Sequence, residues 1–330
     1  MPVRELIKKA HVKLIGSTDD ILDPLKAHDT IRSDPSFDVT VVPTFRTDSV
    51  VNIGLPGFSE YLGKLSDVAG CAITDFAGLA KAIRIRMDDF AKRGCRSIDQ
   101  ALMDVPCTPF TREEIDRILK KALAGGIPTK QEEDIYLCGL LFEIASACKE
   151  RDWVMQLHVG AKRDNNSYLL RTVGVDVGGD CIGSFGNLSM LPQFMDALNE
   201  ACCLPKMILY SINPADNPVL DSMIGCFQEA GTVGKIQHGA AWWFSDNLNG
   251  IRNHLTSLAS LSVLGNFIGT LTDSRAYVNY SRHDYFRRIL CDTVGEWIDR
   301  GEYPKDIPFA GSMIQDICWR NVNRYFGFGL

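Results

Sequence analysis

Short runs of apolar and β-branched residues recur along the chain, and each ends in a polar or glycine-rich cluster before a stretch with helical spacing. This alternation predicts repeated strand-then-helix units. Strands are predicted at residues 12–15, 39–42, 95–97, 153–158, 207–210, 235–237 and 267–271. Helices are predicted at residues 57–65, 76–93, 111–123, 130–151, 191–201, 218–230, 251–264, 285–300 and 313–325. The pattern therefore predicts an α/β protein.

Polar residues gather immediately after the predicted strands, notably at residues 17–20, 46–48, 99–100, 158–166, 242–246 and 272–275. A TIM-like (β/α)₈ barrel carries its chemistry at these carboxyl ends. A doubly wound open sheet also binds ligands at the carboxyl ends of its strands. The count of seven predicted strands suits such an open sheet better than a count of eight would. No linker interrupts the chain, so residues 1–330 are interpreted as one domain with a helical insertion at about 111–151.

Composition narrows the class of protein. With 45% hydrophobic and 23% charged residues, the chain is typical of ordinary globular proteins. Its formal charge of −6 and the lack of a dense Lys/Arg tract disfavour a nucleic-acid partner. The uncharged stretch 255–272 is long enough to raise the question of a membrane span, but it is rich in Ser and Thr and broken by Gly265. We interpret it as a helix followed by a buried strand.

The N-terminal sequence and the spacing of the cysteines indicate the cellular compartment of the protein. Charged residues alternate with apolar ones at the N-terminus, so no apolar core for a signal peptide is present and export is not expected. The 11 cysteines are scattered without CxxC spacing, which favours buried free thiols in a reducing cytoplasm.

Three predicted strand ends carry residues suited to chemistry. His158 begins a polar loop, although a buried core histidine explains it equally well. Asp273 could bind a cation or accept a proton, and Arg275 could clamp a substrate carboxylate; a helix N-cap with a structural ion pair is the alternative. Arg46 follows another strand, and two such arginines favour an anionic substrate.

Adjacent indoles mark a fourth strand end. Trp242 and Trp243 are interpreted either as core packing or as a wall for the apolar face of a sugar. The P-loop, GxSxG and strand-linked GxGxxG patterns are absent, which disfavours nucleotide-dependent and serine-hydrolase chemistry.

Several runs resemble the uronate isomerase (glucuronate isomerase) family of the amidohydrolase superfamily. The resemblance covers nearly the whole chain and rests on QLHVGAKRDNN (156–166), ILYSINPADN (208–217), MIGCFQ (223–228), GKIQHGAAWWFSD (234–246), GTLTDSRAY (269–277) and YSRHDYFRRILC (280–291). It implies a distorted (β/α)₈ barrel of the metal-dependent hydrolase kind. The implied reaction interconverts D-glucuronate with D-fructuronate, and D-galacturonate with D-tagaturonate.

The resemblance also implies roles for individual residues. Asp273 matches a metal-binding aspartate and is expected to act as ligand or base, while His158 is expected to bond a hydroxyl or carbonyl group. Arg46, Arg275 and Trp242 match substrate-binding positions. The implied cofactor is one divalent metal, commonly zinc, and the implied partner is a small hexuronate.

The chain departs from the family pattern at the metal site. The family HxH pair is absent, because the six histidines stand at positions 11, 28, 158, 238, 254 and 283. Gln100 stands in place of a family histidine, and Lys162, Asp164 and His238 also differ. Family members are longer before residue 12, so strand one and an active-site tyrosine are expected to be missing.

These departures leave alternatives open. Weak or no metal binding is expected, because a tight site needs three or four protein ligands. The chain is then expected to have little isomerase activity, as an impaired remnant of the enzyme, or to be another amidohydrolase-type sugar enzyme. A barrel lacking one strand leaves two open edges, which favours a homo-oligomer.

Overall fold

The computed structural model describes residues 2–183 and 188–330, which form two compact units. The first unit comprises residues 2–12, 157–183 and 207–330, and the second comprises Lys13–Gln156 and Leu188–Lys206. Six strands are hydrogen-bonded in the order β1-β2-β3-β4-β7-β8, while β5 and β6 form a separate two-stranded sheet. The pairs β1–β2, β2–β3 and β7–β8 are parallel, as alternating strands and helices predict.

The second unit alternates strands with helices along most of its length. Its elements are β1 (Leu14–Asp20), α2 (Lys26–Arg32), β2 (Thr40–Arg46), α3 (Asp48–Val51), α4 (Phe58–Ala69), α5 (Phe76–Ala91), β3 (Ser97–Leu102), α6 (Arg112–Leu123), α7 (Lys130–Glu150), the start of β4 (Val154–Val159) and α9 (Leu191–Glu200). Strand β3 is buried at nearly every position, as expected for a parallel strand covered on both faces.

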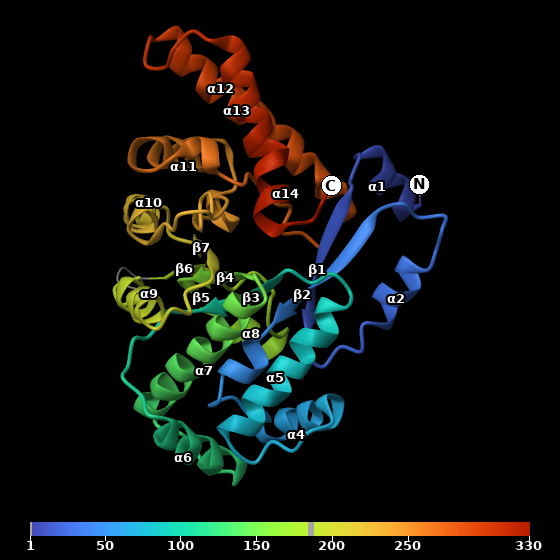
Figure 1. Ribbon diagram of the computed structural model, residues 1–330, viewed down its shortest axis with the longest axis vertical. Coiled ribbons are helices and arrows are strands. Elements are labelled where there is room, and N and C mark those ends of the chain that lie inside the picture. The colour runs from blue at the N-terminus through green and yellow to red at the C-terminus, as the bar shows by residue number, and fades with distance from the viewer. Residues whose placement is uncertain (1, 184–187) are drawn as a thin grey trace. The chain divides into compact units, whose positions relative to one another are not determined.

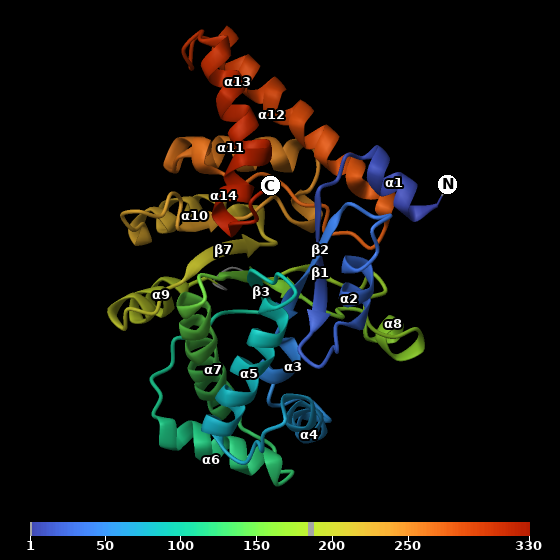
Figure 2. The ribbon, with the colours of Figure 1, turned by 45° about the vertical axis from the view of Figure 1, so that its right-hand side comes forward.

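Helices α6 and α7 form the helical insertion and begin with the same chemistry. Thr111 and Glu114 close a capping box at the start of α6, as the sequence predicts, and Thr129 and Glu132 close another at the start of α7. Figures 1 and 2 show α7 lying beside α5, with α6 crossing near their ends. Tyr136 of α7 is fully buried, and its hydroxyl donates to a backbone carbonyl at the end of α3.

The first unit contains more irregular structure. Its elements are α1 (Val3–Lys9), the end of β4, β5 (Ala161–Lys162), α8 (Ser167–Thr172), β6 (Cys181–Ile182), β7 (Lys206–Ser211), η1 (Pro214–Asp216), α10 (Asn217–Met223), η2 (Ile224–Phe227), β8 (Ile236–His238), η3 (Trp243–Ser245), α11 (Leu248–Leu261), η4 (Leu264–Asn266), η5 (Tyr277–Tyr280), α12 (Ser281–Asp299), α13 (Ile307–Gln315), the π-helical turn η6 (Asp316–Arg320) and α14 (Asn321–Phe326). Helices α10 and α11 pack side by side (Figure 1).

The seventh predicted strand, at residues 267–271, is not a strand in this structure. Phe267 and Ile268 are buried as predicted, but the amide of Asn321 donates to the carbonyl oxygens of Gly265 and Phe267. Gly269 then adopts a φ of +78°, and a Cβ there would lie 2.5 Å from the carbonyl oxygen of Ile317. The backbone here is thus held by the side-chain amide of Asn321 and by the close approach of Gly269 to Ile317, and it has no hydrogen-bonded neighbouring strand among the described residues.

The observed architecture is a TIM-like α/β fold. Six strands with intervening helices agree with the barrel prediction, and the prediction of a single domain stays a prediction. Among residues 2–183 and 188–330, no helix has the length and apolar character needed to cross a bilayer.

Candidate functional site

A pocket in the first unit lies where several strands end. It is lined by His158, Tyr210, Ala240, Ala241, Trp242, Trp243, Asp246, Leu271, Asp273 and Arg282. His158 and Tyr210 are the penultimate residues of β4 and β7, and residues 240–243 follow β8. The cavity measures about 20 Å³, which is room for about one water molecule, so it can hold only part of a sugar acid.

Asp273 is fixed in the pocket by two indoles. The Nε1 atoms of Trp242 and Trp243 both donate to its Oδ2 atom, at 3.2 and 3.1 Å. In the part of the chain that the structure describes, Oδ1 of Asp273 accepts no hydrogen bond. One carboxylate oxygen is therefore oriented by the protein, and the other is available to a ligand.

His158 forms part of an aromatic wall beside this carboxylate. Its ring stacks on Tyr210 with a centroid separation of 4.3 Å and meets the edge of Trp242 at 4.9 Å. Gly239 makes this packing possible, because a Cβ there would lie 2.2 Å from an atom of the Tyr210 ring. The position of the histidine ring thus depends on a close approach that only glycine permits.

An ion pair supports the segment that carries Asp273. Arg282, at the start of α12, pairs with Asp246 at 3.3 Å and also donates to the carbonyl oxygen of Thr272. The hydroxyl of Tyr285 donates to the same Asp246 carboxylate. Burial and the adjacent charge of Asp246 raise the pKa of Tyr285 to about 12, so the phenol keeps the proton that it donates.

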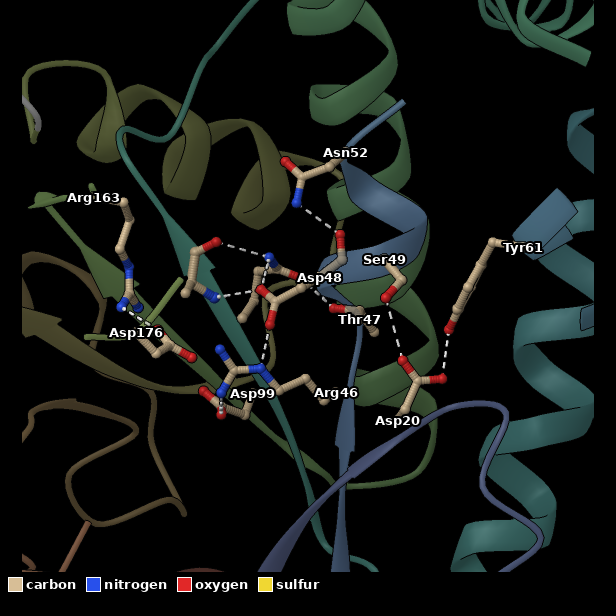
Figure 3. A network of polar contacts seen from close by, with 12 residues as sticks. Asp20, Arg46, Thr47, Asp48, Ser49, Asn52, Tyr61, Asp99, Arg163 and Asp176 are labelled. Carbon is tan, nitrogen blue, oxygen red and sulfur yellow. Dashed lines mark hydrogen bonds and ion pairs between the residues drawn. The ribbon is translucent and has the colours of Figure 1, made fainter. Parts of the chain in front are cut away.

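Arg46 belongs to the second unit and ends strand β2 (Figure 3). The parallel register places it beside Asp99 of β3, and its guanidinium pairs with Asp99 and Asp48. Burial lowers the pKa of Arg46, but the charges of Asp99 and Asp48 outweigh burial and leave it above its ordinary value. Two carboxylates therefore hold the guanidinium in place.

The same network holds Gln100, which the family resemblance predicts to stand in place of a histidine. The side chain of Gln100 is buried, accepts from the hydroxyl of Thr47 and donates to Asp48 at 2.7 Å. The amide thus gives Asp48 a neutral donor. Nearby, Tyr61 donates to Asp20 at the end of β1 at 2.7 Å (Figure 3). Polar side chains at the ends of β2 and β3 are consequently held by one another, and Asp20 at the end of β1 is held by Tyr61.

The structure brings together three of the five predicted site residues. His158, Trp242 and Asp273 line one pocket, whereas Arg275 does not: its side chain is 94% exposed and lies 3.8 Å from Asp176. Arg46 is placed in the second unit, in the network just described.

Sequence reasoning did not single out Tyr210, Asp246, Arg282 or Asp99. Tyr210 was hidden within an apolar strand, while Asp246 and Arg282 stood in runs that resemble the family. Asp99 could have been selected from the sequence, because it lies next to Gln100 just after a predicted strand. Only the sheet register shows that it faces Arg46.

The donor set does not fit a divalent metal. Within residues 2–183 and 188–330, no three side chains of His, Cys, Asp and Glu lie close enough together to hold a metal ion. Asp273 already accepts two indole N–H groups on one oxygen, and tight sites use three or four protein ligands. No catalytic step is therefore assigned to a metal on these residues.

Known proteins are similar to this chain in sequence and in fold. The chain is 47% identical over 328 residues to a uronate isomerase of Lachnoclostridium phytofermentans, covering 99% of this chain and 70% of that protein. It is 44% identical over 330 residues to a uronate isomerase of Lachnospira eligens, covering 100% of this chain and 70% of that protein. A crystal structure of uronate isomerase from Thermotoga maritima matches with a TM-score of 0.91 and 29% identity, covering 98% of this chain and 69% of that one.

The match to a family profile agrees with these relatives. Residues 1–326 match the family described as glucuronate isomerase. This range includes every element that lines the pocket and the strand end that carries Arg46. The two sequence relatives described above are each named uronate isomerase. The chain therefore belongs to the glucuronate isomerase family, which is a family of isomerases.

Proposed function

We propose that the pocket in the first unit carries the proton transfer of a uronate isomerase acting on D-glucuronate and D-fructuronate, and on D-galacturonate and D-tagaturonate. The observation that supports this is the Asp273 carboxylate, with Oδ2 held by two indoles and Oδ1 open to a ligand. A base oriented in this way can reach a substrate proton without losing its own position.

The reaction moves hydrogen between two carbons of the open-chain sugar acid. Asp273 takes the proton from C2, the C2–H electron pair forms a C1=C2 bond, and the aldehyde oxygen becomes the hydroxyl of an enediol on taking up a proton. The hydroxyl on C2 then loses its proton and becomes the ketone, while C1 receives a proton from Asp273. The proton that the C2 hydroxyl gives up replaces the one that the aldehyde oxygen takes up, so hydrogen and electrons balance and no oxidant is required.

The other predicted residues bind and orient the substrate in this proposal. His158 bonds a substrate hydroxyl or carbonyl, and Trp242 presents its indole to the sugar. Arg275 anchors the substrate carboxylate, since a guanidinium can bind a carboxylate through two parallel hydrogen bonds. The substrate-binding role that the resemblance implies for Arg46, in the second unit, stays a prediction. Arg46 is already oriented by Asp99 and Asp48, so little ordering is needed when it binds.

The family resemblance implies a divalent metal, zinc by expectation, but no group of described residues could hold one. That this chain binds the metal weakly and has little isomerase activity stays a prediction. We place the chain in a reducing cytoplasm, with a small hexuronate as its partner and with neither nucleic acid nor membrane as a partner. The 11 cysteines are all free, which supports that compartment, but the prediction that they are buried is wrong for most of them, because four are exposed and three are only partly buried. Self-association stays a prediction.

The experiment measures ketose formation from D-glucuronate by proton NMR. We expect Asp273→Asn to lower kcat by about 10²- to 10⁴-fold, the usual contribution of a general base, because an amide cannot accept the C2 proton. Asp284→Asn is the matched control, since Asp284 pairs with Arg288 on the exposed side of α12. Turnover by Asp273→Asn equal to that of the control would contradict the proposal.

A further inference from the structure

A strap, residues 160–183, leaves the end of β4 and returns to the same place. Its two arms pair through β5 and β6, and the amide of Gly183 donates to the carbonyl oxygen of Gly160 at 2.8 Å. Asp180 ties the strap internally, because its two oxygens accept from the backbone of Asp164 at 2.9 Å and from Arg163 at 2.7 Å. The guanidinium of Arg163 is thereby held from one side.

The other side of Arg163 faces the candidate site. Its guanidinium carbon lies 4.7 Å from the centre of the Trp243 ring, and Trp243 in turn donates to Asp273 at 3.1 Å. A cation over an indole face is attracted to the ring and draws electron density from it, which makes the N–H a better donor. Two side chains, Arg163 and Trp243, thus link the strap to the proposed base.

Trp243 and Asp273 both need external support. Their φ angles are +44° and +39°, in the left-handed region that costs energy for residues other than glycine. Trp242 is 7% exposed and is held by packing, whereas Trp243 is 36% exposed. The ring of Trp243 touches Trp242 on one side, at a centroid distance of 4.7 Å, and its other contacts include the guanidinium on its face and the carboxylate at its N–H.

We propose that Arg163, gripped by Asp180, is a positioning residue that acts through Trp243 to orient the Asp273 carboxylate. The inference rests on the proposed function of Asp273. Without Arg163 the indole of Trp243 can leave the carboxylate, which then keeps only the Trp242 donor. The open oxygen Oδ1 loses its direction toward the substrate, so the chemical step slows while substrate affinity changes little.

The test compares Arg163→Met with Arg171→Met. Arg171 is a matched control, because it also lies on the strap and covers an aromatic ring, that of Tyr168 at 5.9 Å, but contacts no pocket residue among those described. We expect Arg163→Met to lower kcat about tenfold, the loss of one hydrogen bond to a charged group, with KM within about twofold. Arg171→Met should leave both constants unchanged.

A double-mutant cycle and fluorescence separate positioning from general destabilisation. In a Trp243→Phe background, Arg163→Met should cause no further loss of kcat, because its path to Asp273 is already cut. Arg163→Met should also make tryptophan emission more accessible to acrylamide, and this increase should vanish in the Trp243→Phe background. Additive losses of kcat, or quenching no greater than in Arg171→Met, would overturn the proposal.

The outcomes also separate this inference from the proposed function. If the unmodified chain forms no ketose, the proposed function fails, and the quenching of Trp243 alone decides whether Arg163 holds the indole. If the chain turns over and Arg163→Met is as active as Arg171→Met, the positioning role fails and the function of Asp273 stands.

Discussion

The stability of the protein should fall in mild acid because of one buried histidine. His254 lies on α11, is 2% exposed, and its Nε2 atom has no hydrogen-bond partner among the described residues. Its ring packs against His238 at 4.3 Å and Phe267 at 5.3 Å. Burial, followed by the charge of His238, lowers the pKa of His254 well below its ordinary value, so the folded protein keeps this imidazole neutral.

The sign and size of the effect follow from proton linkage. The unfolded chain takes up a proton on His254 at a pKa of about 6.5, whereas the folded chain does not. The contribution to the free energy of unfolding is therefore complete above about pH 6.5 and is lost as the pH falls. Between pH 7 and pH 5 the loss from this one group is about 2 kcal/mol, from 1.36 kcal/mol per pH unit below the unfolded pKa.

Urea unfolding at pH 7 and pH 5 tests this with His254→Leu, which replaces imidazole by an apolar side chain of similar volume. We expect the variant to lose about 2 kcal/mol less stability than the parent between the two pH values. His238, which is hydrogen-bonded to the buried Asp221 at 2.7 Å, is present in both the parent and the variant. Any contribution of His238 to the pH dependence of stability therefore largely cancels in the comparison. Ile251→Val on the same helix should lower stability equally at both pH values, by about 0.5–1.5 kcal/mol. An identical pH dependence in parent and His254→Leu would refute the reasoning.

Two further substitutions test local packing. Gly239→Ala should displace the ring of Tyr210 and the stacked His158, which we expect to cost about 1–3 kcal/mol in urea unfolding and to lower kcat/KM; unchanged kcat/KM would contradict this. Thr129→Ala removes the capping box shared with Glu132 and should cost about 1 kcal/mol, while Thr129→Ser should restore most of it. Equal stability of these two variants would show that the cap contributes nothing.

Strongly patterned elements were predictable from the sequence. Helix α5 was predicted at residues 76–93 and runs from Phe76 to Ala91, and α7 was predicted at 130–151 and runs from Lys130 to Glu150. Long amphipathic or buried segments with clear caps carry this information locally. Short helices were missed, among them α2 and α8, because seven or fewer residues give too little periodicity.

Other errors came from contacts that no local pattern reveals. The predicted helix at residues 313–325 is divided by the π-helical turn η6, and the helix predicted at 218–230 ends in the 3₁₀ turn η2. The predicted strand at 267–271 lost its ladder to the amide of Asn321, more than 50 residues further along the chain. Such distant hydrogen bonds can override an apolar, β-branched run.

The sequence by itself determined the order of strands and helices, the residues at the strand ends and the family resemblance. It could not determine which of those residues meet, because strand-end side chains far apart in sequence become neighbours only through sheet register and loop closure. Tertiary structure decided that Asp99 holds Arg46, that two indoles hold Asp273, and that Arg275 is exposed. The physical reason is that hydrogen bonds and ion pairs act over a few ångströms in space, whatever the separation along the chain.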